Sequence, residues 1–122
     1  MQFKKPTDKD DFDSGAIRPR LHALLLAIDE FCVYHELPEV VVTSLCSLND
    51  KHEKDSQHYH GEAADIRAHH LTAPQLALIL NYAHEHYWRS EKNIVDRPMR
   101  AAYAYGEGDA FHIHLSIDKQ RS

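Results

Sequence analysis

The stretch AAYAYGEGDAFHIHLSI at positions 101–117 has the clearest strand pattern in the chain. Residues 101–105 and 111–117 are rich in aromatic and aliphatic side chains, which favour strands. Gly106 and Gly108 favour a turn between the two segments. We therefore predict two strands joined by a tight turn, and such a pair must bury one face against other elements to be stable.

The second of these strands carries two histidines on one face. His112 and His114 are separated by one residue, and side chains alternate along a strand, so both project from the same side. The opposite side would then carry the apolar residues into the core, namely Phe111, Ile113 and Leu115. One face is thus available for chemistry while the other holds the strand in place.

The rest of the chain predicts an α+β fold. Apolar residues at three- and four-residue spacing predict one helix, and a Thr-Ala-Pro-Gln capping box begins another. The expected order is helix, strand, loop, strand, helix, strand, strand, which gives a small antiparallel sheet with helices packed on it. The predicted elements are a helix from Pro19 to a point before Pro38, a strand at 40–43, a strand at 62–67 and a helix from Thr72 to about Trp88.

The domain organisation follows from length and composition. Residues 1–15 are polar and rich in aspartate, and we expect an extended or poorly ordered arm there. Residues 16–122 are long enough for one hydrophobic core, so we expect a single domain. Within it, the polar segments 45–60 and 89–100 are predicted to be a long loop and a connection.

Composition narrows the class of function. The formal net charge of −5 argues against a binder of nucleic acid or of anionic membranes, since both usually require a basic face. No apolar run approaches the roughly 18 residues of a membrane helix, and the N-terminus lacks the apolar region of a signal peptide. Cys32 and Cys46 do not make a disulfide framework, and we expect buried thiols. We therefore expect a monomer that is made in the cytoplasm and does not insert into a membrane.

A second histidine-rich segment, SQHYHGEAAD, occupies positions 56–65. His58 lies at the end of the predicted loop and Asp65 on the strand that follows, and Gly61 permits a tight reversal between them. Imidazole nitrogen and carboxylate oxygen are zinc ligands, and catalytic zinc is often held by three protein side chains with water in the fourth position. Together with the distant His-x-His pair, this segment predicts a zinc site on the sheet.

Such a site also needs groups that move protons. Zinc lowers the pKa of its water to about 7 and polarises a carbonyl group, and a general acid or base adds about 10²–10⁴ in rate. Asp109 and Glu107, just before the histidine strand, are the candidates for the base. His112 is a candidate to stabilise the oxyanion.

The pattern Ser56-x-His58-x-x-Gly61-x-Ala63-x-Asp65 resembles the signature of the M15 family of zinc D-Ala-D-Ala carboxypeptidases and L-Ala-D-Glu endopeptidases. The resemblance is particularly close to the small phage and prophage members of that family. It implies a zinc-dependent peptidase that hydrolyses peptide bonds of the bacterial cell-wall stem peptide by attack of a zinc-bound water. It also implies action at the cell wall, after release from the cell or as a component of a virion.

The pair His112-x-His114, followed by an apolar residue, resembles the C-terminal motif of the same family. The resemblance implies that His58, Asp65 and His114 bind Zn²⁺ and that His112 is the active-site histidine. An alternative remains, because Asp109 lies three residues before His112, as in an acid-x-x-His motif. Either His112 is the ligand with Asp109 as base, or His114 is the ligand and the base comes from elsewhere. We prefer His114, which is flanked by core residues.

The chain also departs from the family where the substrate binds. Many members carry an arginine after the first strand that holds a substrate carboxylate, whereas this chain has Leu45-Cys46-Ser47 there. Arg67 or Lys51 would have to replace that arginine. Ser56 and His52 are the other predicted contacts to the stem peptide.

Two further hypotheses belong to other classes of protein. The missing arginine and the displaced acid are compatible with a zinc-containing module that binds peptidoglycan or a peptide without hydrolysing it. A structural protein with incidental histidines would instead bind no stoichiometric metal.

Overall fold

The structure, a computed structural model, describes residues 1–45, 63–86, 88–92 and 98–117. It confirms the predicted α+β class. A five-stranded sheet has the order β1-β2-β3-β7-β6, and a separate two-stranded sheet pairs β4 with β5. The strands are β1 (Gln2–Phe3), β2 (Val41–Leu45), β3 (Ala63–Arg67), β4 (Trp88–Lys92), β5 (Pro98–Arg100), β6 (Ala102–Tyr105) and β7 (His112–Ser116). The helices are α1 (Pro6–Ser14), α2 (Pro19–Tyr34) and α3 (Ala73–His86).

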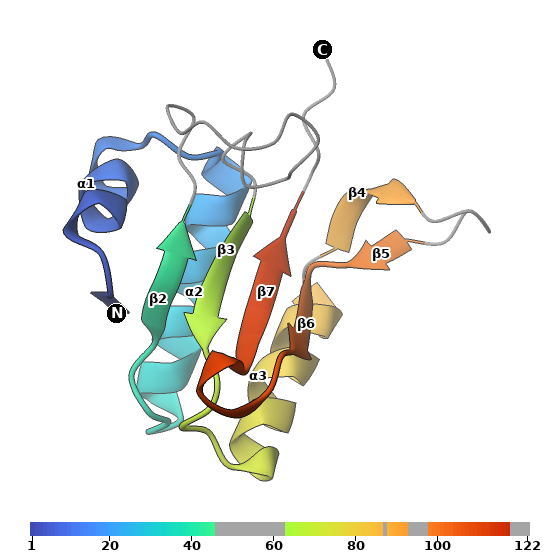
Figure 1. Ribbon diagram of the computed structural model, residues 1–122. Coiled ribbons are helices and arrows are strands. Elements are labelled where there is room, and N and C mark those ends of the chain that lie inside the picture. Colours follow the sequence, from blue (N-terminus) through green and yellow to red (C-terminus); the bar gives the residue numbers. More distant parts are fainter. Residues whose placement is uncertain (46–62, 87, 93–97, 118–122) are drawn as a thin grey trace.

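The two longer helices cover one face of the large sheet. Figure 1 shows α2 and α3 behind the sheet, with β2, β3, β7 and β6 in front of them. All pairings among these four strands are antiparallel, while the short β1 pairs in parallel with β2. The core lies between the helices and the sheet.

Local sequence explains both helices as predicted. α2 has Pro19 in its first turn and ends at Tyr34, before Pro38. Its core face is fully buried, and each of its leucine and isoleucine side chains there contributes about 1.5–3 kcal/mol. The buried residues of α2 are Leu21, Leu24, Leu25, Ile28 and Cys32.

The capping box of α3 is also confirmed. The Thr72 backbone N–H donates to Gln75 Oε1 at 2.9 Å, and the Gln75 N–H donates to Thr72 Oγ1 at 3.3 Å. α3 ends at His86, two residues earlier than predicted, and buries Ile79 and Ala83. The His84 ring lies 2.8 Å from the Ala102 carbonyl oxygen and ties this helix to β6.

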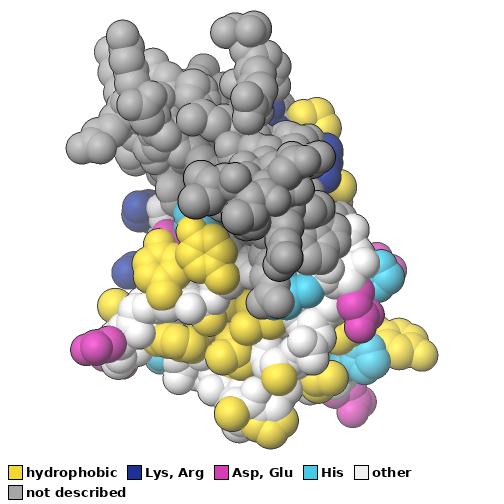
Figure 2. All heavy atoms as spheres, turned by 90° about the vertical axis from the view of Figure 1, so that its right-hand side faces the viewer, with side chains coloured by type: hydrophobic (Ala, Val, Ile, Leu, Met, Phe, Trp, Pro, Cys, Tyr) yellow, Lys and Arg dark blue, Asp and Glu magenta, His cyan; other side chains and the backbone are white. Residues whose placement is uncertain are grey.

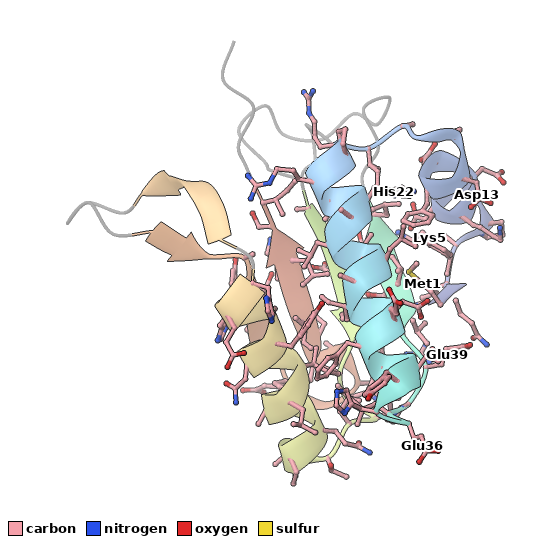
Figure 3. All side chains as sticks on the ribbon, turned by 180° about the vertical axis from the view of Figure 1, so that it is seen from behind. Met1, Lys5, Asp13, His22, Glu36 and Glu39 are labelled. Carbon is pink, nitrogen blue, oxygen red and sulfur yellow. The ribbon has the colours of Figure 1, made fainter. Side chains whose placement is uncertain are left out.

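The prediction of an extended or poorly ordered arm at residues 1–15 is wrong. Residues 2–3 form β1, and Pro6–Ser14 forms α1. Phe12 is buried, with its ring stacked on His22 of α2 at 4.2 Å between centroids; Figure 3 shows His22 projecting toward α1. Buried Asp8 accepts a hydrogen bond from the Leu45 backbone N–H at 3.2 Å. One aromatic ring and one buried carboxylate thus attach α1 to the domain.

The predicted polar connection at 89–100 is also corrected, since it contains most of β4 and all of β5. Other predictions agree more closely. The strands expected at 40–43 and 62–67 are β2 and β3, and the strands expected within 101–117 are β6 and β7. Most of the predicted loop at 45–60 lies outside the described residues. No helix in the described ranges is long and apolar enough to cross a membrane.

The turn between β6 and β7 depends on glycine geometry. Gly106 has a φ of +100°, and a Cβ placed there would lie 2.6 Å from the Ala110 carbonyl oxygen. That carbonyl belongs to a short 3-10 turn, Gly108–Ala110, that leads directly into the histidine strand. The backbone must therefore approach itself closely just before His112, and only glycine leaves the space.

We expect Gly106→Ala to destabilise the protein more than Gly15→Ala does. Gly15 also has a positive φ of 78°, but no atom lies within 4 Å of its added Cβ, so only the roughly 1–2 kcal/mol of left-handed strain applies. Gly106→Ala adds a backbone clash to that strain. Urea unfolding monitored by circular dichroism measures both losses. Equal losses would contradict the close approach at Gly106.

Candidate functional site

Pairing of β3 with β7 brings the predicted acid and histidines together. Asp65 lies directly opposite His114 in the antiparallel register, and Arg67 lies opposite His112. Asp65 Oδ1 is 2.8 Å from His114 Nδ1 and 3.7 Å from His112 Nε2. The two imidazoles thus converge on one carboxylate oxygen.

These three side chains occupy the face of the sheet opposite the helices. Ile113 and Leu115, which alternate with the histidines, are fully buried in the core as predicted. In Figure 1 this open face of β3 and β7 is turned toward the viewer, away from α2 and α3. The alternation of β7 therefore separates the core side chains from the candidate site.

The His112 ring is held with one nitrogen unsatisfied. Its Nδ1 lies 2.8 Å from the Ala110 carbonyl oxygen, which can only accept a hydrogen bond, so Nδ1 carries the proton. In the neutral ring, Nε2 is then an acceptor, and it is buried with no hydrogen-bond partner among the described residues. It faces Asp65 Oδ1, another acceptor, at 3.7 Å. Two facing acceptors without a proton between them suit a bound cation.

The His114 ring is the more firmly held of the two. Its side chain is 8% exposed, against 19% for His112 and 20% for Asp65. Its Nδ1 is at hydrogen-bond distance from Asp65, and Ile113 and Leu115 fix the strand on either side. These contacts favour His114 as a ligand, as expected from its flanking core residues, and the choice between His112 and His114 stays a prediction.

A cleft of about 510 Å³ opens beside the acid. Four predicted site residues line it, namely Asp65, Arg67, Asp109 and His112. Sequence reasoning missed the other polar residues of its wall, which are Lys4, Thr43 and His69. Lys4 follows β1, in the segment predicted to be an arm, so its place in the cleft was not visible from local pattern.

Two tyrosines on β6, also missed, complete the open face. Tyr103 pairs across the sheet with His114, and Tyr105 pairs with His112. The Tyr105 and His112 ring centroids are 4.2 Å apart, and those of Tyr103 and His114 are 5.2 Å apart. Burial, with smaller contributions from Asp65 and Tyr103, raises the pKa of the Tyr105 hydroxyl. The predicted hairpin could have located these tyrosines, because its short turn places Tyr103 opposite His114 and Tyr105 opposite His112.

Several predicted residues cannot be placed. His52, Ser56 and His58 lie outside the described residues, as does Lys51. In the ranges that the structure describes, no group of three His, Cys, Asp or Glu side chains is arranged to hold a metal ion. Of the three predicted zinc ligands, only Asp65 and His114 lie within the described residues, and the zinc site stays a prediction.

We expect Asp65→Ala to lower the stability of the metal-free protein by roughly 1–3 kcal/mol, because it leaves the nearly buried His114 Nδ1 without its acceptor. Asp109→Ala is the matched control, since Asp109 is exposed on the 3-10 turn and its loss should fall within about 0.5 kcal/mol. Urea unfolding in excess chelator gives both values. Equal losses would show that the Asp65–His114 contact contributes nothing to folding.

Comparison with known proteins adds no further assignment to this geometry. No protein-family model matches the chain, and no curated protein matches it.

Proposed function

We propose that the protein is a zinc-dependent peptidase that hydrolyses peptide bonds of the bacterial cell-wall stem peptide. The observation that carries the proposal is the convergence of two imidazoles on Asp65 Oδ1, with His112 Nε2 buried and unsatisfied among the described residues. One carboxylate and imidazole nitrogens are a donor set that zinc accepts. The motif resemblance supplies the substrate class.

Asp65 and His114 would hold the metal together with His58, which lies outside the described residues. A zinc ion there would supply a Lewis acid and make a bound water more acidic at neutral pH. The protein's own contribution is to fix the donors. The core residues of β7 hold His114, and the Ala110 carbonyl fixes the tautomer of His112.

The cleft suits a peptide that carries charged groups. Lys4 and Arg67 place two positive charges in its wall, and such groups bind carboxylates. Asp65 and Asp109 place two carboxylates in the same wall. Asp109, three residues before His112 in the sequence, lines the same cleft and is the candidate acid for proton transfer. His112 also lines this cleft, and its Nε2 is available to accept a proton or, once protonated, to donate a hydrogen bond to the reacting carbonyl group of the substrate.

We expect Asp65→Ala and His114→Ala to lose zinc, whereas His112→Ala retains it. His86→Ala, on the exposed end of α3, is the matched histidine control and should bind zinc as the unchanged protein does. Zinc content by mass spectrometry after dialysis against a mild chelator measures all four. Full zinc occupancy in Asp65→Ala would remove the ligand assignment. Loss in His112→Ala but not in His114→Ala would exchange the roles of the two histidines.

The activity itself is tested with purified peptidoglycan. We expect zinc-dependent release of one defined stem-peptide fragment, detected by mass spectrometry and abolished by excess chelator. Asp109→Asn and His112→Ala should each reduce the rate by about 10²–10⁴ if they transfer protons or stabilise the oxyanion. Glu85→Gln, which alters an exposed acid on α3 away from the cleft, should leave the rate within a few-fold. Folded, zinc-loaded protein that binds peptidoglycan and releases nothing would replace the enzyme by a binding module.

A further inference from the structure

We propose that Tyr103 and Tyr105 form a platform for the sugar of the substrate, beside the candidate zinc site. The inference deepens the proposed function and rests on it for the identity of the substrate. It assigns the glycan-bearing stem peptide, rather than the free peptide, as the molecule that the open face recognises.

The two rings are presented together and remain exposed. Tyr103 is 42% exposed and Tyr105 47% exposed, and their centroids are 5.5 Å apart with ring planes at 22°. They project from β6, an edge strand of the sheet, while Ala102 at the start of the same strand is fully buried and Ala104 between them packs against the core. Figure 2, which faces the β6 side of the molecule, shows hydrophobic side chains grouped at this surface.

Two half-exposed aromatic rings on one edge forgo a large part of the area that such rings usually bury. Their contacts with the histidines and with each other cover part of each ring, and the rest of each ring is open to solvent. Exposed apolar patches beside polar groups mark binding sites. The platform is therefore better explained by a ligand than by packing within the domain.

The chemistry of the platform fits a neutral ring with polar edges. An aromatic face is electron-rich and attracts the weakly positive C–H groups on the flat side of a pyranose, while tyrosine hydroxyls can bond its hydroxyl groups. A sugar therefore suits this pair of exposed tyrosine rings.

Strand order places the platform beside a cleft of mixed charge. Tyr103 and Tyr105 lie on β6, whereas the cleft is lined by two basic and two acidic side chains, namely Lys4, Arg67, Asp65 and Asp109. A ligand that crosses the sheet would thus present a neutral ring at the platform and charged groups in the cleft. A sugar joined to a peptide that carries charged groups has this division.

Titration with a trisaccharide of N-acetylglucosamine tests the platform without any hydrolysis. We expect Tyr103→Ala and Tyr105→Ala each to weaken binding by about five- to tenfold, and the matching Phe variants to retain most of it. Tyr34→Ala, which removes an 82% exposed ring from α2, is the control and should change nothing. Absence of saturable binding, or equal binding by the Ala variants, would overturn the proposal. Should an Ala variant misfold, ring-proton NMR shifts of Tyr103 and Tyr105 in the unchanged protein decide, and unmoved signals would overturn it.

Hydrolysis of a stem peptide with and without its sugar provides the second test. We expect a higher kcat/KM for the sugar-bearing form, and a larger loss on that form than on the free peptide in Tyr103→Ala, mainly through KM. Equal losses on both forms would mean that the rings bind peptide, which overturns the proposal. If the zinc-loaded protein cleaves neither form, the proposed function fails, and the saccharide titration still decides the platform.

Discussion

The antiparallel register of β3 against β7 is the constraint on which the candidate site depends. It places Asp65 opposite His114 and leaves His112 one pair further along, so that a single carboxylate oxygen meets both rings. A slip of one residue would turn the histidines into the core. The buried side chains of Ala64, Ile66, Ile113 and Leu115 prevent that slip, because it would expose all of them to solvent. Core packing on one face thus fixes the chemistry on the other.

The open face has two halves of different character around this centre. The cleft carries Lys4 and Arg67 together with Asp65 and Asp109, whereas β6 presents uncharged tyrosine rings. Strand pairing, rather than nearness in sequence, brings the cleft residues together. Lys4 reaches the cleft because β1 pairs with β2, and the tyrosines reach the histidines because a glycine-dependent turn returns the chain at once. An elongated ligand that is charged at one end and neutral at the other fits this division.

Sequence pattern predicted the parts of the fold that are determined locally. Apolar spacing located α2, the capping box located the start of α3, and the side-chain alternation of β7 separated its core residues from its histidines. α1 was missed because it has a single buried aromatic residue, Phe12, whose partners lie elsewhere in the chain. The proximity of Asp65 to both histidines was expected from motif, but the tyrosines and Lys4 needed the strand order, which local pattern does not contain.

The most direct test of the account is anomalous X-ray diffraction at the zinc edge from crystals grown with zinc. The account predicts one strong peak about 2.0–2.2 Å from a carboxylate oxygen of Asp65 and from a ring nitrogen of His114. A peak that instead lies on His69 and His70, or the absence of any peak beside Asp65 in zinc-loaded crystals, would contradict it.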